Sequence, residues 1–237
     1  MRRIGLLAAG LAAAAAPAWA AVSGNVTATS AYLFRGVQRD SATLQGSLDY
    51  TREDGWYSGL FGSGCEACGG SELDFYGGWS GALANGVSVQ AGAVYYLFAE
   101  SDEGLAPSLD YPEIFAGAGY RGFGATLYYT NDYLDEASDV PGSDQNAFYL
   151  TADYSHTLRE GLELVLQIGR SWGDGIEAVF GDEYLDYSLT LVKTLDDGFS
   201  LSVAVIDTDL ERRATATMPG IEDDPKFVVG LAKDFGF

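Results

Sequence analysis

One stretch decides the fold class of this chain, the C-terminal Pro225-Lys226-Phe227-Val228-Val229-Gly230-Leu231-Ala232-Lys233-Asp234-Phe235-Gly236-Phe237. Large apolar side chains occupy nearly every second position, with small or polar residues between them, and Lys233 is the exception on the apolar face. Side chains of a β-strand point alternately to its two faces, so the pattern predicts a strand with one apolar face. Because the strand includes the final residue, we expect it to close a larger β-structure.

The chain ends on two aromatic residues two positions apart, Phe235 and Phe237. This ending resembles the terminal strand of bacterial outer-membrane barrels, whose last aromatic residue is read by the barrel assembly machinery. The resemblance implies that Phe235 and Phe237 form an assembly signal. An edge strand of a soluble β-sandwich is the alternative, because it would show the same alternation.

The first 20 residues have the pattern of a cleaved signal peptide. Arg2-Arg3 is a basic start, residues 4–16 are apolar, and Ala18-Trp19-Ala20 after Pro17 is a small-residue cleavage site. A transmembrane anchor is the alternative, but the apolar run is too short to span a bilayer. We therefore predict a signal peptide at 1–20 and a single exported domain at 21–237.

Composition restricts the class of protein further. Mean hydropathy is +0.02, and no other apolar run is long enough for a membrane helix, so a membrane protein of this sequence must be a barrel. The chain has 31 glycines, which suit tight turns, and 15 tyrosines, which suit the aromatic belts at membrane interfaces. The net charge of −21 disfavours nucleic acid as a partner and favours cations.

Period-2 alternation recurs along the whole domain. Short turn sequences at 52–55, 81–86, 121–122, 158–161 and 195–198 alternate with long, mostly acidic loops. This asymmetry is typical of outer-membrane barrels, with short periplasmic turns and long external loops. We predict an all-β, transmembrane, antiparallel up-and-down barrel of about twelve strands with both termini periplasmic. Residues 24–34 are expected as its first strand, followed by a connection around 38–42 that is unusually short for its side, and the facing of residues 56–63 is not determined.

The N-terminal third carries the most specific motifs. They are Tyr32-Leu33-Phe34-Arg35-Gly36-Val37-Gln38, Leu44-Gln45-Gly46-Ser47-Leu48-Asp49-Tyr50 and Gly55-Trp56-Tyr57-Ser58-Gly59-Leu60-Phe61-Gly62-Ser63, extended by Glu72-Leu73-Asp74-Phe75-Tyr76-Gly77-Gly78-Trp79-Ser80-Gly81 and the terminal Phe237. In these motifs the chain resembles the TorF-type family of porins, a proteobacterial family long catalogued as of unknown function. The resemblance implies an outer-membrane barrel and a pore, and it implies no catalytic residues.

The face opposite the apolar one carries the candidate pore-lining residues. Most are acidic, and the set is Arg35, Asp49, Asp74, Glu113, Asp132, Asp153, Glu163, Asp186, Lys226 and Asp234. Charged side chains are costly on a lipid face, so we expect them in the lumen, where carboxylates concentrate cations. The alternative is a plugged lumen in which the acids pair with Arg35, Lys226, tyrosines and backbone.

The two cysteines form a CxxC motif, Cys65-Glu66-Ala67-Cys68, in a predicted external loop. Export through an oxidising periplasm favours a disulfide between Cys65 and Cys68. A redox motif or half of a zinc site is the alternative, although the sequence has no second CxxC and a single histidine, so no metal site is predicted. The CxxC loop is not a feature of the TorF-type resemblance.

Outer-membrane barrel hydrolases use Ser and His, and the chain has Ser155 next to His156. Adjacent strand residues point to opposite faces, so these two side chains cannot meet directly. We therefore expect no enzymatic activity.

The predicted function is passive, cation-favouring diffusion of small solutes through an acidic lumen. A closed barrel whose acidic external loops act in recognition, adhesion or envelope structure is the alternative. Expected partners are outer-membrane lipid and lipopolysaccharide, the barrel assembly machinery and small cationic or neutral solutes, with no cofactor. The sequence does not determine the oligomeric state.

Overall fold

The fold, described here from a computed structural model, is a closed barrel. The structure describes residues 21–99, 108–210 and 224–237, so the predicted signal peptide at 1–20 lies outside the described residues. Among the described residues, twelve strands form the wall: β1 (Ala21–Thr29), β4 (Thr43–Thr51), β5 (Trp56–Cys65), β6 (Gly70–Ala82), β7 (Ser88–Ala99), β8 (Tyr111–Tyr120), β9 (Phe123–Thr130), β10 (Ala147–Arg159), β11 (Leu162–Trp172), β12 (Tyr184–Thr194), β13 (Phe199–Thr208) and β14 (Lys226–Gly236). All neighbours are antiparallel, which confirms the predicted antiparallel barrel of about twelve strands.

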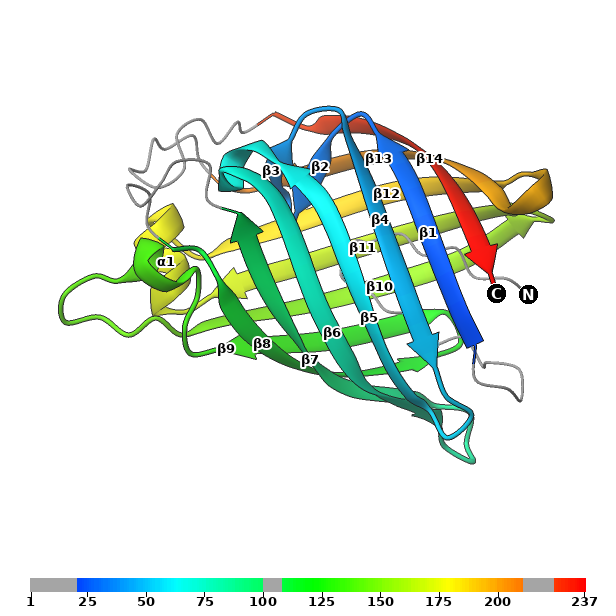
Figure 1. The fold of residues 1–237 in the computed structure, drawn as a ribbon, viewed down its shortest axis with the longest axis horizontal. Coiled ribbons are helices and arrows are strands. Elements are labelled where there is room, and N and C mark those ends of the chain that lie inside the picture. Colours follow the sequence, from blue (N-terminus) through cyan, green and yellow to red (C-terminus); the bar gives the residue numbers. More distant parts are fainter. Residues whose placement is uncertain (1–20, 100–107, 211–223) are drawn as a thin grey trace.

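The last strand closes the barrel, as expected. β14 pairs with β1 from Ser23 opposite Gly236 to Thr29 opposite Gly230, and the two strands lie side by side in Figure 1. The final backbone amide, that of Phe237, donates to the carbonyl of Val22 at 3.0 Å. The closure removes the unpaired edges that an open sheet would expose.

The outer face of the wall is apolar. Leu44, Ile114 and Phe227 are 68%, 60% and 75% exposed, and the other exposed large apolar side chains alternate with buried residues in the same way along the wall strands. Such a surface suits a hydrocarbon environment. Strand β5 follows the rule too, with Trp56 and Leu60 outside and Phe61 buried inside, which settles the facing that the sequence left open.

Lys233 breaks the apolar face close to the end of β14. Its ammonium donates to the carbonyl of Asp197 in the neighbouring turn and lies 4.5 Å from the ring centre of Phe199. The long aliphatic chain thus lies along apolar surface while the charge reaches the polar rim. The exception in the sequence pattern is therefore compatible with a lipid-facing strand.

The two ends of the barrel differ. One end, the turn end, carries the short connections, including η3 (Asp196–Gly198), and there β1 begins and β14 ends. The other end, the loop end, carries the long connections with η1 (Glu66–Cys68), η2 (Asp135–Ser138) and α1 (Asp174–Phe180). Figure 1 shows the turn end at the right and α1 at the left. No helix among the described residues is long and apolar enough to cross a membrane.

The first connection differs from the prediction. β1 ends at Thr29 rather than at Phe34, and β2 (Tyr32–Phe34) and β3 (Val37–Asp40) form a separate hairpin that is not part of the wall. The turn of this hairpin is Arg35-Gly36, with φ of 51° and 80°, the left-handed pair typical of a tight two-residue hairpin. The prediction of one strand over 24–34 is wrong because the alternation continues across the bend, and periodicity alone does not show where the chain leaves the wall.

Candidate functional site

The hairpin β2–β3 projects into the lumen and reaches the opposite wall. Its tip is so close to β12 and β13 that a Cβ added at Gly36 would lie 2.7 Å from the Cβ of Asp186 and 3.2 Å from that of Thr208. Only glycine fits this contact, because φ at this position is also positive. The invading segment is the motif Tyr32–Gln38, and it fills the lumen near the loop end.

Arg35 at the tip binds Glu113 on β8. Nη1 donates to Oε1 at 2.9 Å and Nη2 to Oε2 at 2.6 Å, and each side chain is 1% exposed. The hydroxyl of Tyr96 on β7 also donates to Oε2 of Glu113, at 3.1 Å. A bidentate guanidinium–carboxylate pair is the strongest side-chain contact available to these groups, and burial makes the loss of either partner costly.

Aromatic rings enclose the guanidinium of Arg35. Its Cζ lies 4.3 Å from the ring centre of Tyr149, 5.3 Å from that of Tyr128 and 4.7 Å from that of Phe34. All three distances are within the range of cation–π attraction. Phe115 and Tyr57 complete the aromatic filling below the hairpin. The packing at this level is close, since Glu113 and Tyr149 are 1% and 0% exposed.

A second arginine of the hairpin, Arg39, is also buried. Its Nη1 lies 4.0 Å from Sγ of Cys68 and its Cζ 5.4 Å from the ring centre of Phe34. On the same face, the hydroxyl of Tyr32 donates to Oε1 of Glu72 at 3.1 Å. The hairpin therefore brings two guanidinium groups into an acidic lumen.

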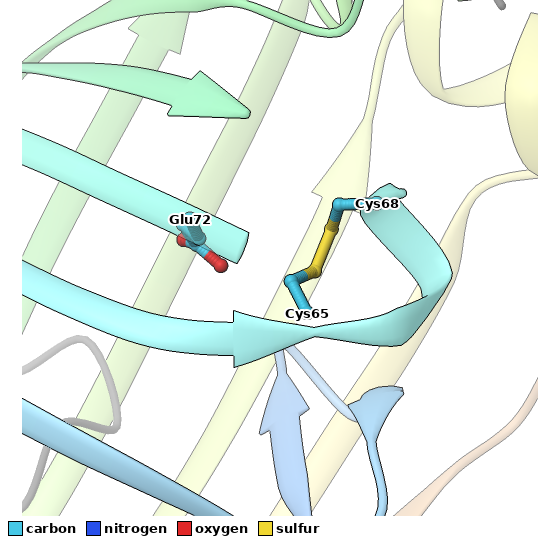
Figure 2. Close-up of side chains that lie close together, drawn as sticks. All are labelled: Cys65, Cys68 and Glu72. Carbon is cyan, nitrogen blue, oxygen red and sulfur yellow. A yellow bond between two sulfur atoms is a disulfide. The ribbon is translucent and has the colours of Figure 1, made fainter. Parts of the chain in front are cut away.

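The cysteines are joined in a disulfide, Cys65–Cys68, at the junction of β5 and η1. Figure 2 shows this bond close to Glu72 at the start of β6. The three side chains are buried and their ligand atoms lie within 4.8 Å of one another, the one such group found in the described ranges. In the disulfide the sulfurs are bonded to each other, so they are not thiolate ligands for a metal. The bond belongs to the same buried cluster as Val37 of the hairpin, so it is enclosed and not exposed to solvent.

The predicted pore-lining residues fall into three groups. Arg35, Asp74, Glu113 and Asp186 are buried at the level of the hairpin. Toward the turn end, Asp49, Asp153 and Glu163 are half-buried on inward-facing positions, and Tyr76 donates to Asp49. Lys226 is half-buried at the loop end of β14, and Asp234 is exposed near the turn end, where it accepts from Asn25 at 2.6 Å.

Asp132 departs from its expected place in the wall. β9 ends at Thr130, so Asp132 lies in the following connection, where it forms an isolated bridge with Gln145. Burial and the nearby charge of Asp135 raise the pKa of its carboxyl group. The alternation that placed it in the lumen therefore runs past the end of the strand.

Two groups of site residues were missed by the sequence analysis. Glu72 shares the inward face of β6 with Asp74, so its parity was a usable signal, but it was not among the predicted pore-lining residues. The inward tyrosines Tyr96, Tyr128 and Tyr149 had no local signal beyond parity and Arg39 had none, because their contacts depend on the hairpin.

Ser155 and His156 occupy opposite faces of β10. Ser155 is half-buried, whereas His156 is exposed and stacks on Tyr154 at 6.1 Å between ring centres. The pair does not form the nucleophile–base contact that a hydrolase requires.

Comparison with known proteins places this barrel in a family. Residues 12–235 match Gcw_chp, described as a bacterial protein of unknown function. The chain belongs to the Gcw_chp family. No functionally curated protein matches the sequence significantly.

Solved structures show what fold this Gcw_chp protein shares. It is similar to the KdgM porin in complex with disordered oligogalacturonate, with a TM-score of 0.57, 8% identity and coverage of 91% of this chain and 99% of that one. The NanC porin gives a TM-score of 0.58 at 8% identity, and the match covers 90% of this chain and 98% of that one. The COG4313 outer-membrane channel from Pseudomonas putida F1 gives a TM-score of 0.53 at 13% identity, and the match covers 94% of this chain and 97% of that one. At these identities the likeness establishes the porin-type barrel fold.

Proposed function

We propose that this Gcw_chp protein is an outer-membrane channel for passive diffusion of small solutes, and that the hairpin β2–β3 is its gate. The observation that carries the proposal is that the segment filling the lumen is separate from the wall. β1 pairs directly with β4 up to Thr29 opposite Thr43, and Ser30 still bonds to Val229 of β14, so the wall is continuous without the hairpin residues 32–40. The hairpin can therefore move without breaking hydrogen bonds between wall strands. The pore implied by the TorF-type resemblance supports the same function.

Cation preference is part of this proposal. In the turn-end half of the lumen, Asp49, Asp153 and Glu163 are half-buried at inward-facing positions, so a solute passing there would meet carboxylates. Acidic groups in a narrow low-dielectric passage attract cations and repel anions. The guanidinium groups of Arg35 and Arg39 oppose this field while the hairpin is in the lumen. We therefore expect cation selectivity to be strongest when the hairpin has left.

Placement in the envelope follows from the same architecture. We infer that residues 1–20 direct export, that the turn end faces the periplasm and that the loop end faces outward, as the short turns support. The apolar outer face would contact lipid, with lipopolysaccharide around the loop end. Phe235 and Phe237 are exposed on β14 and the end of the chain, where the assembly machinery could read them.

The test is the reversal potential of the refolded protein in a planar bilayer under a KCl gradient, measured for the wild type and for Arg35→Ala. We expect infrequent openings in the wild type, frequent openings in the variant, and a cation-selective sign in both. An anion-selective sign in the variant would overturn the cation preference.

A closed barrel is the second candidate, and one observation favours it. The loop end is filled by a buried apolar cluster that includes Tyr133, Leu134, Ile176 and Phe180, beneath η2 and α1. Such a cap suits a rigid external surface for recognition, adhesion or envelope structure. If folded Arg35→Ala protein gave no conductance, this candidate would replace the channel.

A further inference from the structure

The wall groups around Arg35 form a receptor site for a guanidinium group. Glu113 lies on β8, Tyr128 on β9 and Tyr149 on β10, and only Phe34 comes from the hairpin itself. The three wall strands are hydrogen-bonded neighbours, so their arrangement is set by the barrel register and not by the hairpin. The site would therefore persist when Arg35 leaves it.

The chemistry of this site selects guanidinium over ammonium. The two oxygens of Glu113 accept two parallel hydrogen bonds, a geometry that matches the planar fork of a guanidinium. The ring of Tyr149, 4.3 Å away, offers a face on which a flat cation can stack. An ammonium ion is a compact point charge and cannot make the forked contact.

An unused acceptor lies beside the site. Asp186 on β12 is 2% exposed, and its Oδ1 accepts from the hydroxyl of Tyr149 at 3.2 Å. Its Oδ2 is buried and accepts no hydrogen bond from the described residues. A buried carboxylate oxygen without a donor is unusual. A solute that carries a second donor on a short chain from its guanidinium could satisfy this oxygen, whereas Arg35 does not.

We propose that Arg35 is a built-in mimic of a solute, and that small guanidinium-bearing cations compete with it for Glu113, Tyr128 and Tyr149 and release the hairpin. This inference rests on the proposed channel function, whose solute class it names. Arg35 is tethered, so its effective concentration is on the order of millimolar or above. In the wild type a free guanidinium must exceed that concentration, and without Arg35 it binds directly.

The experiment measures binding calorimetrically to detergent-folded protein, whose fold is checked by heat-modifiable gel mobility. The probes are guanidinium chloride at millimolar concentration, agmatine, which adds an ammonium group to a guanidinium, and butylammonium. We expect Arg35→Ala to bind agmatine at least about ten-fold more tightly than the wild type does and more tightly than guanidinium. Butylammonium should bind at least about ten-fold more weakly than agmatine. Equal affinity for agmatine and butylammonium, or no binding to Arg35→Ala, would overturn the inference.

Two further variants make the assignment specific. Adding Glu113→Gln to Arg35→Ala should abolish agmatine binding, and unchanged binding would contradict the site. Arg170→Ala is the matched control, because Arg170 pairs with Glu183 at an exposed position outside the lumen, and it should bind like the wild type. If Arg35→Ala does not fold, Arg35→Lys serves instead: it keeps the charge but not the fork, and should bind agmatine more tightly than the wild type. Failure of that gain would equally overturn the inference.

Conductance of the same preparations separates this inference from the function on which it rests. Conduction without agmatine binding would leave the channel standing and remove the guanidinium site. Agmatine binding without conduction in any variant would retain the site as a ligand site of a closed barrel and remove the channel.

Discussion

The two halves of the lumen are built from the same alternating strands and yet differ in accessibility. In the loop-end half, Arg35, Glu113 and Tyr149 are almost fully buried, whereas in the turn-end half Asp49 and Asp153 are half-buried. The difference comes largely from the connection between β1 and β4, whose hairpin enters only the loop-end half, together with the apolar cluster of η2 and α1 at that end. The wall thus decides which side chains face inward, and the connections decide whether solvent reaches them.

The largest effect is expected from Glu113→Gln, which leaves Arg35 as a buried charge without its partner. Breaking a buried pair costs about 3–5 kcal/mol. The hairpin should therefore leave the lumen, and the inward side chains of the loop-end half should become as accessible to solvent as those of the turn-end half. Urea unfolding in lipid vesicles would measure the loss in free energy of unfolding. The frequency of channel openings in a planar bilayer would show whether the hairpin still closes the lumen. The control is Glu183→Gln, whose exposed pair with Arg170 should contribute below about 1 kcal/mol. Equal effects of the two variants would contradict the importance of the buried pair.

Gly36→Ala tests whether the tip must fit against β12. Positive φ costs about 1–2 kcal/mol for alanine, and the contact with Asp186 adds about 1–3 kcal/mol of overpacking. The matched control is Gly142→Ala, since Gly142 has φ of 87° and no atom within 4 Å of an added Cβ. Urea midpoints of the two variants separate strain from the clash. If they coincide, the tip is not tightly packed.

The double variant Cys65→Ala and Cys68→Ala removes the cross-link beneath the hairpin. A short closed loop of this kind contributes about 2 kcal/mol in the chain-entropy description. We expect the urea midpoint of the wild type to fall toward that of the variant when a dithiol reductant is added. The variant itself should not respond to reductant, and a response there would show that the effect does not come from this bond.

The smallest effect is expected from Asp153→Asn in the turn-end half. Removing one of several lumen carboxylates should move the reversal potential slightly toward zero without changing how often the channel opens. Asp54→Asn is the control, because Asp54 is exposed in a turn outside the lumen and pairs with Arg52. A larger change in Asp54→Asn than in Asp153→Asn would argue against selectivity set in the lumen.

The sequence by itself determined the wall. Alternation in 225–237 and in β11 fixed the strands and their faces, because a period of two is a local property of an extended chain and one face must meet an apolar environment. Even Asp49, Asp74 and Asp186, far apart in the chain, could be assigned to the inward face from their parity. The sequence does not show where β9 ends, because strand ends depend on the packing of the connection that follows. Asp132 was therefore wrongly assigned to the wall.

Only the tertiary structure decided what fills the lumen. Alternation runs on from Val26 through Phe34, so nothing local marks the bend after Thr29 at which the chain turns inward. Arg35 and Glu113 are 78 positions apart in the chain, and their contact exists because the closed register of the wall sets β8 opposite the tip of the hairpin. A contact across the lumen depends on barrel closure as a whole, and strand periodicity carries no information about it.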